Sequence, residues 1–277
     1  MIRAHDLGVK GDESVCRAVK DHNLDGVQLV AYKCTDDIKY ECGGIDLCRA
    51  EKLGNTLQSG GCQIALIGAY FNPVHPNEEK IERGISVFRD YLSVAKSLGC
   101  DYVGSETGSY NGDPWIYHPM NHSDEALDRV VAIFSSLADY AAERGVSIAM
   151  EGAFGHVCHT PERLFEVVQR IGRSNIKIIF DLYNYLDITN YESAYDILDR
   201  GLKIFGSSIL LFHVKDFVIG EGKLRQCGVG RGILDYDKIL SKIYEINPDA
   251  ILVLEGTTGE DIDFAVSYLR EKINKLS

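Results

Sequence analysis

Eight short apolar runs alternate with longer amphipathic stretches along this 277-residue chain. Each run is rich in Val, Ile, Leu and Phe and is continuously apolar, as in strands that are buried on both faces. The runs cover residues 2–5, 26–30, 63–68, 101–104, 146–151, 176–181, 209–213 and 250–255. Because helical stretches separate them, the pattern predicts repeated βα units with a parallel sheet beneath helices.

The amphipathic stretches predict helices, and two of them begin with clear capping sequences. Thr160, Pro161 and Glu162 supply a side-chain cap, a preset φ and an acid that the helix N-terminus favours. Ser123, followed by two acids, does the same for another helix. The segment 34–61 is weakly periodic, and we expect a long, lid-like loop with a helix over residues 47–53. Outside this segment, the predicted helices cover residues 78–98, 123–144, 161–171, 193–205, 236–246 and 260–275.

Length and composition favour one closed barrel. The 277 residues match the roughly 250 that a (β/α)8 TIM barrel needs, and a hydrophobic content of 45% allows a sizeable core. No linker or low-complexity tract divides the chain. We therefore expect the α/β class and a single (β/α)8 TIM barrel domain over residues 1–277. An open, doubly wound sheet is the alternative that the pattern alone permits.

Charge and apolar content argue against several classes of partner. A formal net charge of -12 opposes binding to a phosphate backbone, so we expect no nucleic-acid partner. No apolar run reaches the roughly 18 residues of a membrane span, and the first residues lack a signal-peptide profile, so we expect a cytoplasmic protein without membrane contact. The eight cysteines include no CxxC pair, which predicts reduced, structural thiols.

Four of the apolar runs end in a side chain that can bind a metal ion. These side chains are Glu151, Asp181, His213 and Glu255, and each lies about one βα unit beyond the previous one. A barrel places the carboxyl ends of its strands at one mouth, so the four side chains should converge there. Three carboxylates and one imidazole suit Mn²⁺, Mg²⁺, Co²⁺ or Zn²⁺. The sequence therefore predicts a site for one divalent metal ion.

The same four positions carry a resemblance to a known family. The segments AMEG around Glu151, FDLYN around Asp181, FHVKD around His213 and LEGT around Glu255 resemble the sugar phosphate isomerases and epimerases of the xylose isomerase-like TIM barrel superfamily. The resemblance runs over nearly the whole chain. It implies that these residues bind one divalent ion and that Glu151 and Glu255 also act as acid and base.

Five further residues are candidates for substrate binding. By the resemblance, Lys215 and Asp216 match an HxKD pattern whose lysine lines the substrate site, and Arg225, before GVGRG, matches an arginine that grips substrate oxygens. Asn184 stands where many relatives have a histidine, and its amide can orient a substrate hydroxyl but is a poor metal ligand. Glu106, after the fourth run, can point into the same mouth.

Other side chains near the predicted mouth have weaker claims. Trp115, the only tryptophan, can wall an apolar side of the pocket or simply pack. We expect His5 to be a hydrogen-bonded histidine of the barrel. We expect His156 and His159 to pack within their loop.

The chemistry that these residues favour is proton transfer next to a carbonyl on a small, sugar-like substrate, as in an isomerase or epimerase. A dehydratase of the inosose or dehydroshikimate type begins with the same proton abstraction and is the near alternative. An AP endonuclease-like barrel would need more metal ligands, and a non-catalytic barrel would need none. The sequence leaves open the exact substrate, its phosphorylation and whether the chain forms a homo-oligomer.

Overall fold

Eight parallel strands close into a barrel at the centre of the computed structural model, which describes residues 1–113 and 115–276. Around the barrel the strand order is β1-β10-β7-β6-β5-β4-β3-β2. Ile2 of the first strand pairs with Leu254 of the last, which closes the sheet and confirms the predicted (β/α)8 fold. The strands are β1 (Ile2–Arg3), β2 (Gly26–Leu29), β3 (Gln63–Gly68), β4 (Tyr102–Glu106), β5 (Ser147–Glu151), β6 (Ile176–Asp181), β7 (Ile209–Val214) and β10 (Ile251–Leu254).

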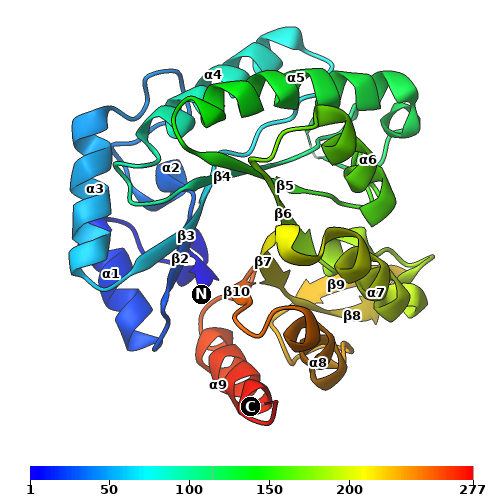
Figure 1. Cartoon of the computed structure of the whole chain (residues 1–277). Helices are drawn as coiled ribbons and strands as arrows, with labels where there is room; N and C mark the ends of the chain where they lie inside the picture. Colours follow the sequence, from blue (N-terminus) through cyan, green and yellow to red (C-terminus); the bar gives the residue numbers. More distant parts are fainter. Residues whose placement is uncertain (114, 277) are drawn as a thin grey trace.

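Helices surround the barrel on its outer face (Figure 1). The predicted caps are present, since Thr160 accepts the Arg163 N–H and Ser123 accepts the Ala126 N–H. The helix expected over residues 47–53 extends to Ser59. The α-helices are α1 (Asp12–Asp21), α2 (Ala31–Cys34), α3 (Leu47–Ser59), α4 (Glu78–Val94), α5 (Asp124–Ala142), α6 (Pro161–Ile171), α7 (Ala194–Phe205), α8 (Tyr236–Ile246) and α9 (Asp261–Ile273). Short 3-10 turns are η1 (Ala4–Leu7), η2 (Pro119–His122), η3 (Tyr183–Tyr185), η4 (Tyr191–Ser193) and η5 (Gly206–Ser208).

The core has two layers. One fills the barrel interior, where a Cβ on Gly104 would lie 2.9 Å from Ile179 Cδ1, so only glycine fits beside that isoleucine. The other lies between strands and helices and includes Phe88 and Phe134. Among the described helices, none is both long and apolar enough to cross a membrane. The interior layer consists of Ala65, Leu66, Ala149, Ile179, Leu211 and Val253.

An antiparallel hairpin that the sequence did not predict follows β7. It consists of β8 (Asp216–Gly220) and β9 (Lys223–Cys227), which pair with each other outside the barrel sheet. Its two turn residues, Glu221 and Gly222, have φ values of 52° and 70°. Two positive φ angles are what a two-residue hairpin turn of type I′ requires. The shape of the hairpin is therefore set by its own turn and its own pairing.

Candidate metal centre

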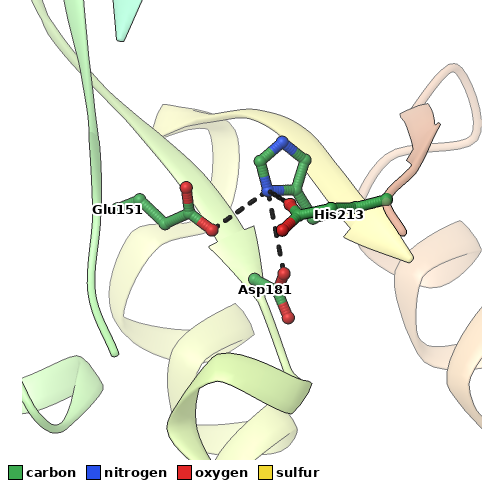
Figure 2. Close-up of side chains that lie close together, drawn as sticks. Glu151, Asp181 and His213 are labelled. Atoms are coloured by element: carbon green, nitrogen blue, oxygen red, sulfur yellow. Dashed lines mark hydrogen bonds and ion pairs between the residues drawn. The ribbon is translucent and has the colours of Figure 1, made fainter. Parts of the chain in front are cut away.

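The carboxyl ends of β5, β6 and β7 bring Glu151, Asp181 and His213 together (Figure 2). Asp181 and His213 are direct partners in the β6–β7 register, and Glu255 follows β10 on the other side of β7. One possible ligand atom from each of the four residues lies within 4.8 Å of those of the other three. The convergence predicted from the strand ends is therefore present in the fold.

His213 lies at the centre of the four side chains. Its Nδ1 is 3.0 Å from Glu151 Oε1, 2.8 Å from Glu255 Oε2 and 3.7 Å from Asp181 Oδ2. Figure 2 shows its other ring nitrogen pointing away from the carboxylates. Glu151, Asp181 and His213 are buried, whereas the side chain of Glu255 keeps 13% of its surface exposed. Glu255 is thus the member most open to the mouth.

Lys215 neutralises part of this buried negative charge. Its Nζ lies 2.8 Å from Glu255 Oε1 and 2.9 Å from Asp181 Oδ2, and it donates a hydrogen bond to Asn184 Oδ1 at 2.9 Å. Buried carboxylates are costly unless a cation or a metal compensates them. The predicted proximity of Lys215 to the mouth is present, but its ammonium is engaged by protein carboxylates.

Burial and the neighbouring charges strongly shift the pKa values of the side chains in the cluster. Burial would lower the pKa of His213, but the Glu151 and Glu255 carboxylates raise it to about 10. Burial raises the pKa of Asp181 to about 6 despite the opposing charge of Lys215. Burial also opposes ionisation of Glu255, yet Lys215 and His213 hold its pKa well below the usual range. Glu255 is therefore an ionised carboxylate beside Lys215, His213 and Arg3.

Asn184 holds a carboxylate in place. Its Nδ2 donates to Glu151 Oε1 at 2.8 Å, its Oδ1 accepts from Lys215, and its backbone N–H donates to Asp181 Oδ1 at 3.0 Å. All these bonds lie within the cluster, so the Asn184 side chain orients Glu151, and its expected contact with a substrate hydroxyl stays a prediction.

A pocket of about 330 Å³ opens onto this cluster. Glu106, Glu151 and Glu255 line one part of it, so Glu106 lies at the mouth as expected. Burial, reinforced by the Glu151 and Glu255 charges, raises the pKa of Glu106 well above its usual range. A larger pocket of about 400 Å³ lies at the opposite end of the barrel and is lined mainly by apolar residues such as Leu24 and Val266. The candidate metal ligands therefore open onto the smaller pocket.

The wall of the pocket that faces the carboxylates consists mainly of basic and aromatic residues. Trp115 lines it, and His156 packs in its loop with its ring centroid 5.7 Å from that of Trp115. His5 also lines the pocket, and burial together with Arg3 lowers its pKa to about 4. The expectation that His5 is fully hydrogen-bonded is wrong, because its buried Nδ1 has no partner among the described residues. The other residues of this wall are Arg3, Val30, Tyr32, Lys33, Tyr70 and Asp113.

Asp216 is not among the residues that line this pocket. Asp216 is fully buried, and its carboxylate accepts backbone N–H groups of Phe217, Gly230, Gly232 and Leu234 at 2.8–3.2 Å. A Cβ at Gly232 would lie 2.2 Å from Asp216 Oδ1, which explains one glycine of GVGRG. Asp216 thus ties the hairpin to the loop before α8 and has no group left for a substrate.

Arg225 also lies outside this pocket. It sits on β9, its side chain is 55% exposed, and its guanidinium pairs with Glu221 on the hairpin turn. Its guanidinium is engaged on the two-stranded hairpin sheet, which is separate from the barrel sheet, so the expected contact with substrate oxygens stays a prediction.

Three residues at the site were not identified from the sequence. Arg3 Nη1 lies 2.8 Å from Glu255 Oε1, and Gln28 and Tyr70 contact His213 and Glu151. Gln28 did leave a signal, because it is the one polar side chain in the run GVQLV. A polar side chain within an otherwise apolar buried strand needs a partner, and here that partner is a predicted metal ligand.

Comparisons with known proteins agree with this fold. The inosose isomerase of Bacillus velezensis is 25% identical over 196 residues, 67% of this chain and 63% of that protein. The D-psicose 3-epimerase of Agrobacterium fabrum is 26% identical over 190 residues, 65% of this chain and 60% of that protein. The chain thus spans about three fifths of the length of these relatives.

A solved structure of the IOLI protein with a binding zinc atom has a TM-score of 0.75 to this chain. It is 18% identical, and the match covers 100% of this chain and 98% of that one. The family model for the xylose isomerase-like TIM barrel matches residues 16–272. With this match over nearly its whole length, the chain belongs to the xylose isomerase-like TIM barrel family.

Proposed function

We propose that the chain is a divalent-metal-dependent isomerase or epimerase of a small sugar, ketose or sugar phosphate, acting by proton transfer next to a carbonyl. The observation that carries the proposal is the convergence of Glu151, Asp181, His213 and Glu255, of which Glu151 and Glu255 line an open pocket. The isomerase and epimerase relatives support the same class of reaction.

The donor set fits a divalent ion. Asp181 Oδ2 is buried and accepts no hydrogen bond within the described chain, although the Lys215 ammonium lies 2.9 Å away. Three carboxylates and one imidazole supply oxygen and nitrogen donors of the kind that such ions prefer. The zinc atom in the IOLI structure supports this assignment. A bound ion would polarise a substrate carbonyl and stabilise the negative charge that develops on its oxygen.

Glu151 and Glu255 are suited to proton transfer on two sides of a substrate. They end β5 and follow β10, which lie three positions apart around the barrel. Glu151 is oriented by Asn184, and Glu255 is oriented by Lys215 and Arg3. Because both glutamates line the pocket, one of them, as a carboxylate, can remove a carbon-bound proton, and the other, as a protonated carboxylic acid, can deliver its own proton to the opposite face.

A substrate panel in deuterated water tests the proposal. The metal-loaded protein is incubated with neutral ketoses, ketose phosphates and inososes, and the products are followed by NMR and mass spectrometry. We expect deuterium at one carbon and a product of otherwise unchanged composition. Loss of water would instead identify a dehydratase. A metal-loaded protein that exchanges no carbon-bound hydrogen on any substrate would contradict the proposal.

Metal analysis tests the ligand set separately. We expect Asp181→Ala to lose most of its bound divalent ion, because it removes one of the buried ligands of the set. The matched control is Asp139→Ala, which removes an exposed aspartate paired with Arg173. Wild-type metal content in Asp181→Ala would show that the four residues do not form the site.

A further inference from the structure

A chain of hydrogen bonds lies behind the predicted metal ligands and joins two of them. His213 Nε2 is 2.5 Å from Gln28 Oε1, and Gln28 Nε2 donates to Tyr70 Oη at 2.7 Å. Tyr70 Oη in turn points its hydrogen to Glu151 Oε2, at the longer distance of 3.5 Å. Both ends of one buried amide are thus used, one toward His213 and one toward the tyrosine that contacts Glu151.

The direction of this chain follows from the chemistry of the amide. The Gln28 oxygen only accepts and its nitrogen only donates, so His213 must keep a hydrogen on Nε2. The Nδ1 of His213 is then directed at the carboxylates, where it can serve as a ligand atom. The reversed amide would leave Nε2 as the acceptor and Nδ1 as the protonated nitrogen, which cannot bind a metal. Gln28 therefore determines which ring nitrogen of His213 is available to bind a metal ion.

Gln28 is held where it can make this selection. It lies on β2 and has no exposed surface, so an amide without hydrogen-bond partners would be destabilising there. Its neighbours in the strand are apolar. The hydrogen bonds to His213 and Tyr70 therefore explain why an amide is present at this position.

Tyr70 is fixed from several sides. A Cβ at Gly68 would lie 2.7 Å from its ring, so the glycine at the end of β3 leaves space for the phenol. The Tyr70 carbonyl accepts from Tyr40 Oη at 3.1 Å, and the Ala69 N–H donates to the Gly104 carbonyl at 3.0 Å. The position of the phenol is therefore set by the backbone of the loop after β3.

We propose that Gln28 and Tyr70 are positioning residues that couple the orientation of His213 to that of Glu151. Gln28 presents His213 Nδ1 to the metal site, and Tyr70 carries the same constraint to the carboxylate that moves a proton. The proposal rests on the proposed function, in which His213 is a ligand and Glu151 an acid or base. What it adds is that Gln28 on β2 and Tyr70 after β3 determine the orientations of His213 and Glu151.

Metal binding and spectroscopy test the proposal without a substrate. We expect Gln28→Leu to weaken Co²⁺ binding about 10- to 100-fold, the usual cost of losing such a supporting bond, and to alter the visible absorption spectrum of the bound ion. Gln28→Glu should stay within about tenfold of wild type, because a carboxylate can accept the same Nε2–H bond. Gln169→Leu is the control, because it makes the same glutamine-to-leucine change at an exposed position on α6.

Nitrogen NMR of the histidine in the Zn²⁺-loaded protein gives a second readout. We expect His213 to carry hydrogen on Nε2 and metal on Nδ1, and the Nε2–H signal to change in Gln28→Leu and in Gln28→Glu. If Gln28→Leu does not fold, the change in Gln28→Glu still tests the contact. Metal on Nε2, or wild-type binding and spectra in every Gln28 variant, would overturn the proposal.

Tyr70→Phe tests the second half of the chain. We expect Co²⁺ affinity within about threefold of wild type, because no ligand is removed, and a turnover number about tenfold lower at unchanged KM. Tyr91→Phe, at a buried tyrosine on α4, is the control. An unchanged turnover number would remove Tyr70 from the proposal. A wild type that binds no divalent ion would instead refute the proposed function, so the two failures can be told apart.

Discussion

The end of β7 and the β8–β9 hairpin are neighbours in the chain but differ in almost every respect. His213 has less than a tenth of its surface exposed and faces three carboxylates, whereas Arg225, twelve residues later, is more than half exposed and pairs only with the hairpin turn. Lys215 lies at the transition, with its ammonium inside the cluster.

The difference shows what positions a functional side chain in this fold. β7 is hydrogen-bonded to β6 and β10, so its register fixes where His213 points. The two hairpin strands form a ladder only with each other, and the hairpin is tied to its surroundings by side chains: Asp216 bonds to the loop before α8, and Gln226 donates to the Glu255 carbonyl. The barrel therefore determines the position of strand-end residues, whereas hairpin residues follow local turn chemistry.

The largest effect is expected at the strand ends. Glu151→Gln and Glu255→Gln keep the size of the side chain and remove its basic group, so turnover should fall about 10²- to 10⁴-fold with metal partly retained. Each variant should still exchange substrate hydrogen with deuterated solvent on the face served by the remaining glutamate. Steady-state kinetics and exchange NMR measure both effects, with the exposed Glu82→Gln as control. Near-wild-type turnover in both variants, with metal bound, would place the chemistry elsewhere.

Metal affinity should rise steeply with pH because of His213. Without metal its pKa is about 10, so between pH 7 and 9 a binding ion must displace a proton from the ring. The dissociation constant should therefore fall about tenfold per pH unit, roughly 100-fold over this range. Titrations at pH 7, 8 and 9 in a non-coordinating buffer measure the slope. A pH-independent constant would mean that His213 is already neutral or is not a ligand.

Lys215 should matter more to the metal-free protein than to the metal-bound one. Lys215→Met removes the cation between Asp181 and Glu255, and breaking a buried pair costs about 3–5 kcal/mol. Added divalent ion should restore more stability to this variant than to the wild type. Denaturant unfolding with a chelator and with Mn²⁺ measures both quantities. Lys96→Met, at an exposed pair with Asp101, should cost less than about 1 kcal/mol. Equal losses in the two variants would contradict this view of Lys215.

The sequence predicted what depends on strand periodicity and missed what depends on loops and on lateral contacts. Each of Glu151, Asp181, His213 and Glu255 could be identified because it follows an apolar run, and parallel strands end at one face. Arg225 could not be placed, because the residues on either side of the turn at Glu221 and Gly222 have no strand pattern that distinguishes a hairpin from a loop.

Side chains that act across the barrel were also missed. Arg3 reaches Glu255 between neighbouring strands, but β1 and β10 lie at opposite ends of the chain and pair only when the barrel closes. Gln28 was visible as a polar residue in an apolar strand, yet its partner His213 lies 185 residues away in the sequence. Without the register, nothing in the sequence linked them.

The smallest effect is expected at Arg225, and this expectation tests the comparison most directly. In this arrangement its guanidinium pairs with Glu221 on an exposed hairpin, and such exposed pairs contribute less than about 1 kcal/mol. Arg225→Ala should therefore leave KM and turnover within about twofold of wild type, and the free energy of unfolding within about 1 kcal/mol. Arg3→Ala is the informative counterpart, because its guanidinium lies 2.8 Å from Glu255 Oε1 and lines the pocket, so turnover should fall clearly. Parallel kinetics of the two variants measure the contrast. A tenfold or larger rise in KM for Arg225→Ala would show that the hairpin closes over the mouth when substrate binds, and that the separation between barrel and hairpin does not persist during turnover.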